Sequence, residues 1–267
     1  MTERATTADW DAATYDRLAS PQEAWAREVL DRLPLRGDET VLDAGCGSGR
    51  VTKLLLERLP RGRLIGVDGS PSMVEAASEA IAGDERVALL CCDLLELTPA
   101  ILAEEAGTGD VDVVFSNATF HWIADHERLF SRLRAVLRPG GRLVAQCGGA
   151  GNVSSWRQGV EAASEQEPFR EYVGGFRPWN FYGPEETDAR LRAAGFADVR
   201  CWLQEVEPIV PDDPREYVAV VGLAAHHERL PERLREPFVE AVIDNVSKPF
   251  ELRYVRLNID ARLPEAA

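Results

Sequence analysis

The sequence of 267 residues lacks several patterns that mark special classes of protein. Its five cysteines include no C-x-x-C pair, and the adjacent Cys91 and Cys92 cannot form a disulfide with each other without severe strain. Unpaired thiols are typical of a reducing compartment, so we expect a cytoplasmic protein. Neither the cysteines nor the four histidines have the spacing of metal ligands, so we predict no metal site.

Long apolar runs are also absent. No segment approaches the roughly 20 apolar residues of a membrane-spanning helix, and the opening residues M-T-E-R-A-T-T-A-D-W lack the apolar core of a signal peptide. The net charge of −15 is spread along the chain and would repel nucleic-acid phosphates and anionic membranes. We therefore expect a small molecule as the partner, no nucleic acid or membrane, and a monomer or homodimer.

Strand and helix patterns alternate through the first half of the chain. Apolar segments typical of buried strands lie at 40–43, 64–68, 87–93, 111–117 and 142–147, and helical spacing occurs at 22–33, 51–59, 71–81, 99–105 and 126–137. The segment P-G-G at 139–141 is expected to end the last of these helices. This alternation predicts an α/β fold with a doubly wound, mostly parallel sheet, and ligands at the carboxyl ends of its strands.

The second half is less regular. Scattered aromatics without a strand pattern occupy 152–182. Helices are expected at 184–196, 214–225 and 231–246, a strand at 198–206, and a final antiparallel strand at 251–261, which together make a seven-stranded sheet. We predict a single domain over 1–267, with a cofactor-binding core at 15–148 and helical insertions at 149–183 and 211–250 that cover the strand ends.

A glycine-rich segment, V-L-D-A-G-C-G-S-G-R, spans residues 41–50. Glycine allows a ligand to approach the backbone, and a strand-to-helix turn exposes N–H groups to it. A dinucleotide-binding G-x-G-x-x-G motif would need glycine where Arg50 stands. Asp43 would repel a pyrophosphate but attract an ammonium or hydroxyl group. These two features disfavour a nicotinamide-dependent oxidoreductase, which remains the alternative from another class.

Two further acids end the next two strands. Asp68 ends the second strand, beside the glycine loop, where a carboxylate suits the two hydroxyls of a ribose. Asp93 ends the third strand and is placed to accept from an exocyclic adenine amine. A helix cap or a solvated loop residue explains one such acid, but three at successive strand ends favour a nucleoside site.

Several segments together closely resemble the class I S-adenosylmethionine-dependent methyltransferases. They are V-L-D-A-G-C-G-S-G, G-V-D-G-S-P-S-M, C-C-D-L, D-V-V-F-S-N-A-T-F-H-W and L-R-P-G-G. The match covers about residues 15–148 in order and spacing. The segments N-A-T-F-H-W-I-A-D-H and F-Y-G-P-E-E most resemble the trans-aconitate methyltransferase group. The resemblance implies a Rossmann-like fold and S-adenosyl-L-methionine as the cofactor.

The resemblance also implies which residues bind this cofactor. Residues of the glycine loop would hold its methionine part, and those that follow the second and third strands would bind its ribose and adenine. Trp122 would pack over the cofactor or the lid. Tyr15 and Gln22 match a motif that contacts the methionine carboxylate, although helix packing explains both equally well. The implied cofactor-binding residues are Gln22, Asp43, Gly45, Cys46, Gly47, Asp68, Gly69, Ser70, Met73, Asp93, Leu94, Ser116, Asn117 and Trp122.

The acceptor is less defined by the sequence. Guanidinium groups pair with carboxylates, and the candidates for an anionic acceptor are Arg157, Arg170, Arg177, Arg253 and Arg256. A carboxylate needs no general base, whereas a phenol or an activated carbon of a quinone or secondary metabolite does. His121 is the candidate catalytic residue, as a base, a hydrogen-bond donor or a wall of the pocket. Carboxylate O-methylation is the leading prediction, and a catalytically silent binding protein is a further alternative.

Overall fold

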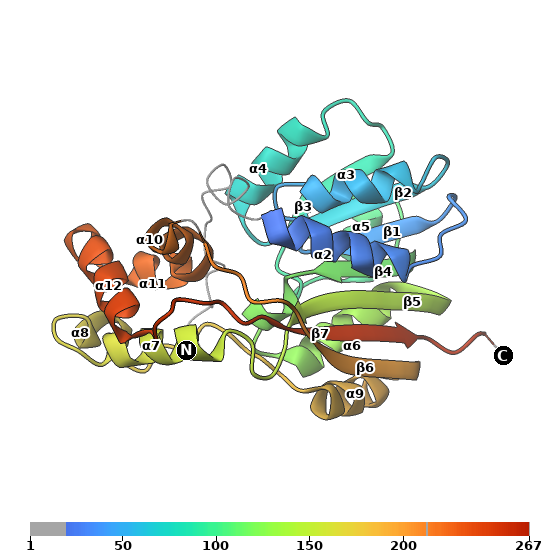
Figure 1. Cartoon of the computed structure of the whole chain (residues 1–267). Helices are drawn as coiled ribbons and strands as arrows, with labels where there is room; N and C mark the ends of the chain where they lie inside the picture. The colour runs from blue at the N-terminus through green and yellow to red at the C-terminus, as the bar shows by residue number, and fades with distance from the viewer. Residues whose placement is uncertain (1–19, 212, 267) are drawn as a thin grey trace.

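The computed structural model describes residues 20–211 and 213–266, and Tyr15 lies outside them. A seven-stranded sheet has the order β3-β2-β1-β4-β5-β7-β6 (Figure 1). Its strands are β1 (Thr40–Ala44), β2 (Arg63–Asp68), β3 (Val87–Cys91), β4 (Val111–Asn117), β5 (Leu137–Gly148), β6 (Ala197–Glu205) and β7 (Val255–Arg262). Strands β1 to β5 pair in parallel, and β7 is antiparallel to both β5 and β6. The predicted fold class is confirmed.

Helices cover both faces of this sheet. They are α2 (Ser20–Asp31), α3 (Arg50–Glu57), α4 (Pro71–Ala80), α5 (Pro99–Ala106), α6 (His126–Val136) and α9 (Pro184–Ala193). Successive residues of a strand point to opposite faces, so Val41 packs with the apolar residues of α2 and α3, and Leu42 with those of α5, α6 and α9. This sandwich explains why the parallel strands are apolar on both faces.

Strand β5 begins earlier than the sequence pattern predicts. It starts at Leu137, directly after α6, so the P-G-G segment lies inside the strand instead of separating it from the helix. The register with β4 is irregular here, because Val111 pairs with Leu137 whereas Val113 pairs with Arg142. Gly140 has a φ of +72°, which allows the extra residues to bulge while the strand continues.

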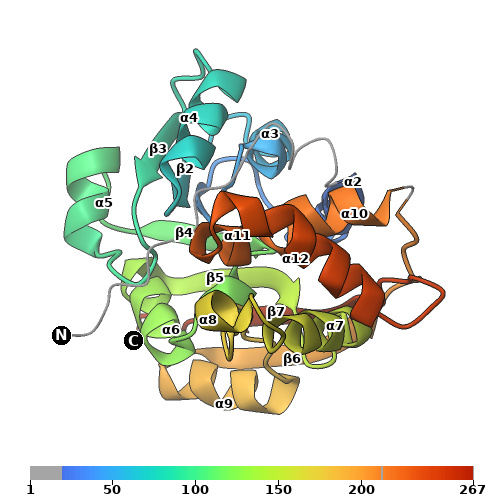
Figure 2. The ribbon, with the colours of Figure 1, turned by 90° about the vertical axis from the view of Figure 1, so that its left-hand side faces the viewer.

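The remaining α-helices, together with one π-helical segment, form a group that we call the helical cap. It comprises α7 (Ser154–Ser164), α8 (Arg170–Val173), α10 (Pro214–Tyr217), the π-helical segment η2 (Val218–Gly222), α11 (Ala224–Arg229) and α12 (Glu232–Asn245). The cap lies beyond the carboxyl ends of the parallel strands and faces the viewer in Figure 2. It has an apolar core of its own, which includes Trp156, Phe169 and Phe238.

The helix predicted at 214–225 is interrupted in the structure. The wider turn of η2 separates α10 from α11. A Cβ atom at Gly222 would lie 2.3 Å from Cζ2 of Trp156, so only glycine allows the two segments to pack this closely. A π-helical turn is frequent at functional sites, and here it brings Val218 and Gly222 to the cavity described below.

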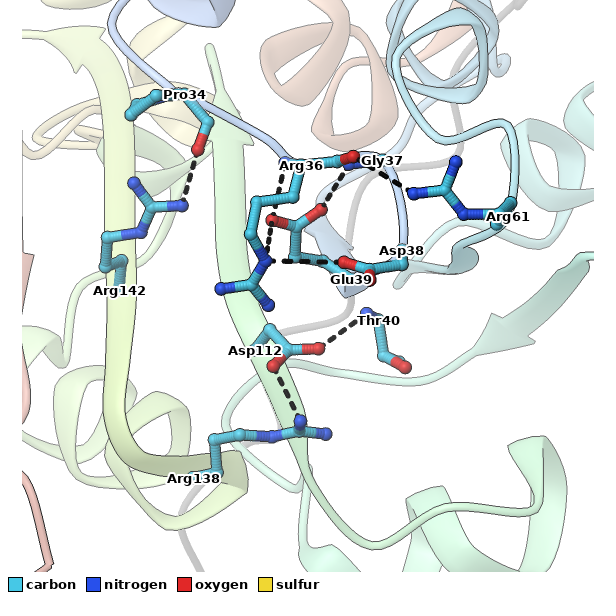
Figure 3. A network of polar contacts seen from close by, with 10 residues as sticks. All are labelled: Pro34, Arg36, Gly37, Asp38, Glu39, Thr40, Arg61, Asp112, Arg138 and Arg142. Carbon is cyan, nitrogen blue, oxygen red and sulfur yellow. Dashed lines mark hydrogen bonds and ion pairs between the residues drawn. The ribbon is translucent and has the colours of Figure 1, made fainter.

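A polar network lies at the amino ends of the central strands, away from the glycine loop (Figure 3). The Asp112 carboxylate accepts from the backbone N–H of Thr40 at 2.7 Å and from the Arg138 guanidinium at 2.6 Å. The buried Glu39 carboxylate accepts from the backbone N–H groups of Arg36 and Gly37 at 2.8 and 2.9 Å. These contacts join the starts of β1, β4 and β5, so hydrogen bonds hold together the amino ends of these three strands.

Candidate active site

The glycine loop that follows β1 needs glycine for two different reasons. Gly45, Gly47 and Gly49 all have positive φ, at +86°, +54° and +84°. A Cβ atom at Gly45 would overlap Thr119, at 2.1 Å from its Oγ1, whereas one at Gly47 would meet no atom of the described residues within 4 Å. Gly45 therefore allows close packing against the segment after β4, and the backbone at Gly47 borders open space where a ligand fits.

Asp68 holds the loop from the neighbouring strand. Its Oδ2 atom accepts from the backbone N–H of Gly47 at 3.0 Å, and its Oδ1 atom accepts from that of Ser70 at 2.9 Å. Burial raises the pKa of Asp68, and the hydrogen bonds from Ser70 and Gly47 oppose that rise. The carboxylate is thus placed beside the glycine loop, as the sequence predicts, and each oxygen keeps a lone pair for a further donor.

Asp43 lies deeper than Asp68. Its side chain is 2% exposed, and its Oδ2 atom accepts from the Thr52 hydroxyl at 2.8 Å. Burial, with a smaller contribution from the nearby Asp68 carboxylate, raises the pKa of Asp43 to about 7, although the hydrogen bond from Thr52 opposes the rise. A cation or a strong donor at the loop would stabilise the charged form of Asp43.

The helix that follows Asp68 begins at the same place. Ser70 is the N-cap of α4, and its hydroxyl accepts from the backbone N–H of Met73 at 3.4 Å. Ser70 and Met73 are both buried, and Gly69 is the residue between the cap and Asp68. These residues therefore lie together at the end of β2, although no contact with a ligand tests their predicted role.

Asp93 and Leu94 follow β3 at the edge of the sheet. Asp93 comes two residues after Cys91, which pairs in register with Asp68. Its carboxylate is exposed and accepts from the backbone N–H of Leu95 at 2.9 Å, whereas Leu94 is buried. The three acids thus lie at the ends of adjacent strands, with Asp43 the most buried and Asp93 the most exposed.

The end of β4 contributes one free acceptor and one occupied donor. The Ser116 hydroxyl is buried and donates to the carbonyl of Ala44 at 2.7 Å, so this hydrogen bond joins β4 to β1 inside the sheet. The Oδ1 atom of Asn117 is buried and has no hydrogen-bond partner among the described residues. An unpaired buried acceptor is costly, so it fits a donor from a bound ligand.

Gln22 and Cys46 are two implied residues whose side chains show no hydrogen bond to another residue of the site in the described part of the structure. The backbone of Gln22 belongs to α2, but its side chain is outside the described part of the structure. Cys46 is buried, and its backbone N–H donates to the carbonyl of Val67 at 3.1 Å, as does that of Gly45 at 2.7 Å. The roles of Gln22 and Cys46 stay predictions from the resemblance.

A cavity opens directly after Asn117, between the ends of the strands and the helical cap. It is lined by residues of the segment after β4, of α7, of the loop before α9, of η2 and of the start of β7. They are Ala118, His121, Trp122, Asn152, Val153, Trp156, Trp179, Phe181, Tyr217, Val218, Gly222, Leu252, Tyr254 and Arg256. Among these, Arg256 is the one permanently charged side chain, and none is acidic.

Four of the lining aromatics form a continuous surface, which we call the aromatic wall: Trp122, Trp156, Trp179 and Phe181. The ring centroid of Trp179 lies 6.3, 4.8 and 6.5 Å from those of Trp122, Trp156 and Phe181. His121 adjoins the wall, 5.1 Å from Trp122 and 5.7 Å from Phe181 between centroids. The wall gives the cavity a large apolar surface next to the residues that follow β4.

His121 is a neutral member of this site. Its ring is 9% exposed, and its Nδ1 atom accepts from the backbone N–H of Gly148 at 3.3 Å. Burial, with smaller electrostatic contributions from Arg256 and His126, lowers the pKa of His121 to about 3. Because a neutral imidazole that accepts at Nδ1 carries its proton on Nε2, we assign Nε2–H as the donor atom of His121.

Arg256 is the one candidate arginine that reaches the cavity. Its side chain is 3% exposed, its Nε atom donates to Oε1 of Gln146 at 3.2 Å, and its guanidinium lies 4.8 Å from the ring centroid of Trp25. Gln146 in turn donates to Asn258 at 2.8 Å, which orients the amide. A buried guanidinium that is held in this way is suited to bind a carboxylate.

The other four candidate arginines lie outside the cavity. Each pairs with a glutamate: Arg157 and Arg177 with Glu161 at 3.8 and 3.6 Å, Arg170 with Glu165 at 3.6 Å, and Arg253 with Glu251 at 2.7 Å. These pairs are partly or largely exposed, so each contributes little to stability. The sequence pattern alone does not separate Arg256 from them.

Sequence reasoning also missed polar groups of the cavity. The indole Nε1 of Trp156 is buried and has no hydrogen-bond partner among the described residues. The hydroxyl groups of Tyr217 and Tyr254 lie 2.7 Å apart. Trp156 belongs to the aromatic-rich segment that the sequence singled out, but its unpaired N–H appears only in the folded chain.

No group of three or more histidine, cysteine or acidic side chains in residues 20–211 and 213–266 could hold a metal ion. Within the same ranges, none of the helices has the length and apolar character needed to cross a membrane.

Comparisons of this sequence with known proteins identify a family model and full-length relatives. The family model described as "Methyltransferase domain" matches residues 42–143. A trans-aconitate 2-methyltransferase of Paracidovorax citrulli is 30% identical over 258 residues, covering 92% of each chain. One of Methylobacterium nodulans is 30% identical over 263 residues, covering 97% of this chain and 92% of its own.

Solved structures show the same fold at lower identity. The Haemonchus contortus phosphoethanolamine N-methyltransferase 2, in complex with S-adenosylhomocysteine, aligns with a TM-score of 0.61 at 20% identity. The alignment covers 95% of this chain but 57% of that longer one. YcgJ of Bacillus subtilis aligns with a TM-score of 0.61 at 16% identity, covering 91% of this chain and 100% of its own.

These comparisons leave no support for the oxidoreductase alternative. Relatives that are 30% identical over almost the whole chain are methyltransferases, and the glycine loop and the strand-end acids are consistent with that family. The chain therefore belongs to the S-adenosylmethionine-dependent methyltransferases, in the trans-aconitate 2-methyltransferase family, and is an enzyme whose cofactor is S-adenosyl-L-methionine.

Proposed function

We propose that this enzyme methylates a carboxylate oxygen of a small organic acid. The observation that carries the proposal is the cavity beside the glycine loop, where the described lining residues include the buried guanidinium of Arg256 and no acidic side chain. A cavity of this charge favours an anion over an amine. Trans-aconitate, the acid in the names of the relatives, is the first acceptor to test.

The cofactor would bind along the ends of β1, β2, β3 and β4. Asp68 would accept from the ribose hydroxyls, and the loop backbone at Gly47 and the buried Asp43 would face the methionine part. The unpaired Oδ1 of Asn117 would accept from the methionine ammonium group. Asp93 would bind the adenine amine. When bound, S-adenosyl-L-methionine supplies an electrophilic methyl group on a sulfonium.

The residues of the cavity would orient the acceptor and exclude water. Arg256 would hold a carboxylate by paired, charge-assisted hydrogen bonds. His121 would donate a further hydrogen bond from Nε2. The aromatic wall keeps bulk water from the acceptor. Methyl transfer is an in-line displacement, so such positioning supplies much of the rate enhancement.

The protonation of His121 separates a carboxylate from the alternative acceptors. A phenol or an activated carbon must lose a proton, and His121 is the candidate base that lines the cavity. With Nδ1 occupied by the Gly148 N–H and a proton on Nε2, neutral His121 has no free lone pair to take that proton. A carboxylate is already ionised at neutral pH and needs no base.

The test is to incubate the enzyme with labelled S-adenosyl-L-methionine and small acids and to identify methyl esters by mass spectrometry. We expect Arg256→Gln to lower kcat/KM for the acid by at least about 100-fold, the cost of a lost charge-assisted pair, at unchanged cofactor Kd. Arg253→Gln, at an exposed arginine nearby, is the matched control and should leave both unchanged. Methylation of phenols but of no acid contradicts the proposal.

A further inference from the structure

We infer that Asn152 is a specificity-determining residue, whose amide acts with His121 to hold the carboxylate oxygen of the acceptor that is not methylated. Asn152 lies in the turn between β5 and α7 and lines the cavity, and its side chain is 4% exposed. This inference rests on the proposed function and deepens it, because it names the residues that select a carboxylate as the reacting group.

A hydrogen bond fixes the orientation of the Asn152 amide. Its Oδ1 atom accepts from the backbone N–H of Val255 at 2.9 Å. Because a backbone N–H can only donate, the atom that it contacts is the amide oxygen, and the other end of the group is the NH₂ donor. Nδ2 has no hydrogen-bond partner among the described residues, and the side chain borders the cavity. The amide therefore has N–H groups available for a bound acceptor.

Gly148 brings the Asn152 amide next to His121. The backbone N–H of Gly148 donates to Nδ1 of His121 at 3.3 Å, and a Cβ atom at Gly148 would lie 2.7 Å from Nδ2 of Asn152. Both side chains thus contact the same backbone unit, where glycine leaves room for the amide. Nε2–H of His121 and the NH₂ group of Asn152 are two neutral donors at one place in the cavity, and we call them the donor pair.

The donor pair lies at the cofactor end of the cavity. Asn117, the proposed partner of the methionine ammonium group, pairs in register with Gln146 of β5. Gly148 is two residues further along this strand, a rise of about 7 Å. Ala118, directly after Asn117, also lines the cavity. The pair is thus close to the place where the methyl group and the acceptor oxygen would meet.

Neutral donors suit the carboxylate that reacts. One of its oxygens gives a lone pair to the methyl carbon, the C–S bond breaks with its electron pair on sulfur, and no proton moves. The acceptor loses its negative charge in this step, and its second oxygen becomes the carbonyl oxygen of the ester. A neutral N–H donates to that oxygen before and after the transfer, so it orients the acid without strongly favouring the charged ground state.

The donor pair also separates acids from phenols. A phenol has one oxygen, which must serve as the nucleophile, so a bound phenol offers no second oxygen to the pair. Buried donors that lose their contact with water and gain no acceptor are costly. The pair therefore favours a carboxylate over a phenol by its hydrogen bonds alone.

Asn152→Asp tests the donor, because it keeps the shape of the side chain and the acceptor for the Val255 N–H. It replaces the NH₂ group with an oxygen that repels a carboxylate. We expect kcat/KM at pH 8 for trans-aconitate, or for the small acid that the wild type prefers, to fall by at least about 100-fold. Calorimetry should show a higher Kd for the acid in the presence of S-adenosylhomocysteine, and an unchanged Kd for S-adenosylhomocysteine itself, which confirms that the variant is folded.

The pH dependence of this loss distinguishes a lost donor from a damaged fold. A protonated carboxyl group donates a hydrogen bond again, and burial raises the pKa of a carboxyl group. The ratio of kcat/KM in Asn152→Asp to that in the wild type should therefore rise as the pH falls from 8 to 5. Titration of the acid itself cancels in this ratio.

Two further variants complete the test. Asn245→Asp makes the same change on α12, where the exposed Nδ2 donates to the Ala241 carbonyl at 2.7 Å, and should leave these values unchanged. Asn152→Ala removes the donor without adding a charge and should raise the Kd of the acid about tenfold. Losses below about threefold in both Asn152 variants, or a loss in Asn152→Asp that is the same from pH 5 to 8, overturn the inference and leave the proposed function intact. A wild type that methylates phenols but no acid overturns both.

Discussion

The backbone N–H of Gly148 donates to Nδ1 of His121 at 3.3 Å, which joins the end of β5 to the segment that follows β4. This bond sets the tautomer of the buried ring and leaves Nε2–H for the cavity. The one histidine that the sequence placed near the reacting atoms is thereby a hydrogen-bond donor. Its chemistry follows from a residue 27 positions away.

The first prediction concerns His121. We expect His121→Gln to lower turnover by less than about tenfold, because a carboxylate acceptor needs no general base. The loss of a general base would instead lower turnover by a factor of about 10²–10⁴. The pH profile of kcat/KM should show no limb near pH 6.5, since the pKa of His121 is about 3. A thousandfold loss, with removal of an acidic limb that the wild type shows, would identify His121 as a base.

Asp68→Ala should weaken cofactor binding by about 1.5–3 kcal/mol, the typical loss of hydrogen bonds to a charged group. The variant also loses the bonds that hold Gly47 and Ser70, so the loop becomes less ordered. Calorimetry measures the Kd. Asp213 also accepts from two backbone N–H groups, those of Arg215 and Glu216, and Asp213→Ala is the matched control. Equal affinities in the two variants would contradict the ribose assignment.

Gly47→Ala tests the open space above the loop. A Cβ atom there meets no atom in the described part of the chain, so we expect only the cost of a positive φ, about 1 kcal/mol of stability, but a large loss of cofactor affinity. Gly107 has a φ of +71° and equally open surroundings on the far end of α5. Gly107→Ala should lose similar stability and no affinity. Normal binding by Gly47→Ala would place the cofactor elsewhere.

Asp43→Asn tests the buried carboxylate through stability. The folded-state pKa of about 7 lies above the ordinary value of 3.8, so the folded protein holds the proton more tightly than the unfolded chain. The free energy of unfolding therefore falls as pH rises from 3.8 to 7. Asn cannot ionise, so the stability of the variant relative to wild type should rise by about 1.4 kcal/mol per pH unit in this window, without cofactor.

Urea unfolding of both proteins at pH 5, 6 and 7 measures this difference. We also expect S-adenosyl-L-methionine to stabilise Asp43→Asn less than wild type, since the variant presents no negative charge at the loop. A stability difference that does not change with pH would show that Asp43 ionises normally in the folded protein.

His226 offers a test inside the helical cap. Its ring is buried among Phe176, Trp179 and Phe238, and neither ring nitrogen has a hydrogen-bond partner among the described residues. His226→Phe should therefore stabilise the protein by about 1–3 kcal/mol at pH 7, the usual cost of an unsatisfied buried polar group. Thermal unfolding measures the gain.

The pH dependence of that gain follows from the pKa of His226, which burial lowers from 6.5 to about 3. Below pH 6.5 the unfolded chain binds a proton that the folded protein does not, so the wild type loses stability as the pH falls. The gain from His226→Phe should thus grow by about 1 kcal/mol between pH 6.5 and 5.5, because the unfolded histidine is half protonated at the start of this interval. His126→Phe removes a bond to the Phe120 carbonyl at 2.9 Å and should instead destabilise.

The sequence by itself determined the sheet and the glycine loop. Apolar runs on both faces and helical spacing between them are local patterns, so β4 was predicted with its observed bounds and most other elements within a few residues. The loop and the strand-end acids follow from the chain direction, because the ends of parallel strands meet at one edge. The P-G-G bulge in β5 was not predicted, since a bulge depends on the partner strand.

Only the tertiary structure decided which groups line the cavity, and with what charge and hydrogen-bonding state. Five arginines look alike in the sequence, and Arg256 differs from the others because β7 buries it next to Gln146 while they pair with glutamates near the surface. The unpaired N–H of Trp156 and the tautomer of His121 depend likewise on segments far apart in the chain. Burial and hydrogen-bond partners are properties of the folded chain, so the charge of the acceptor site could be determined only there.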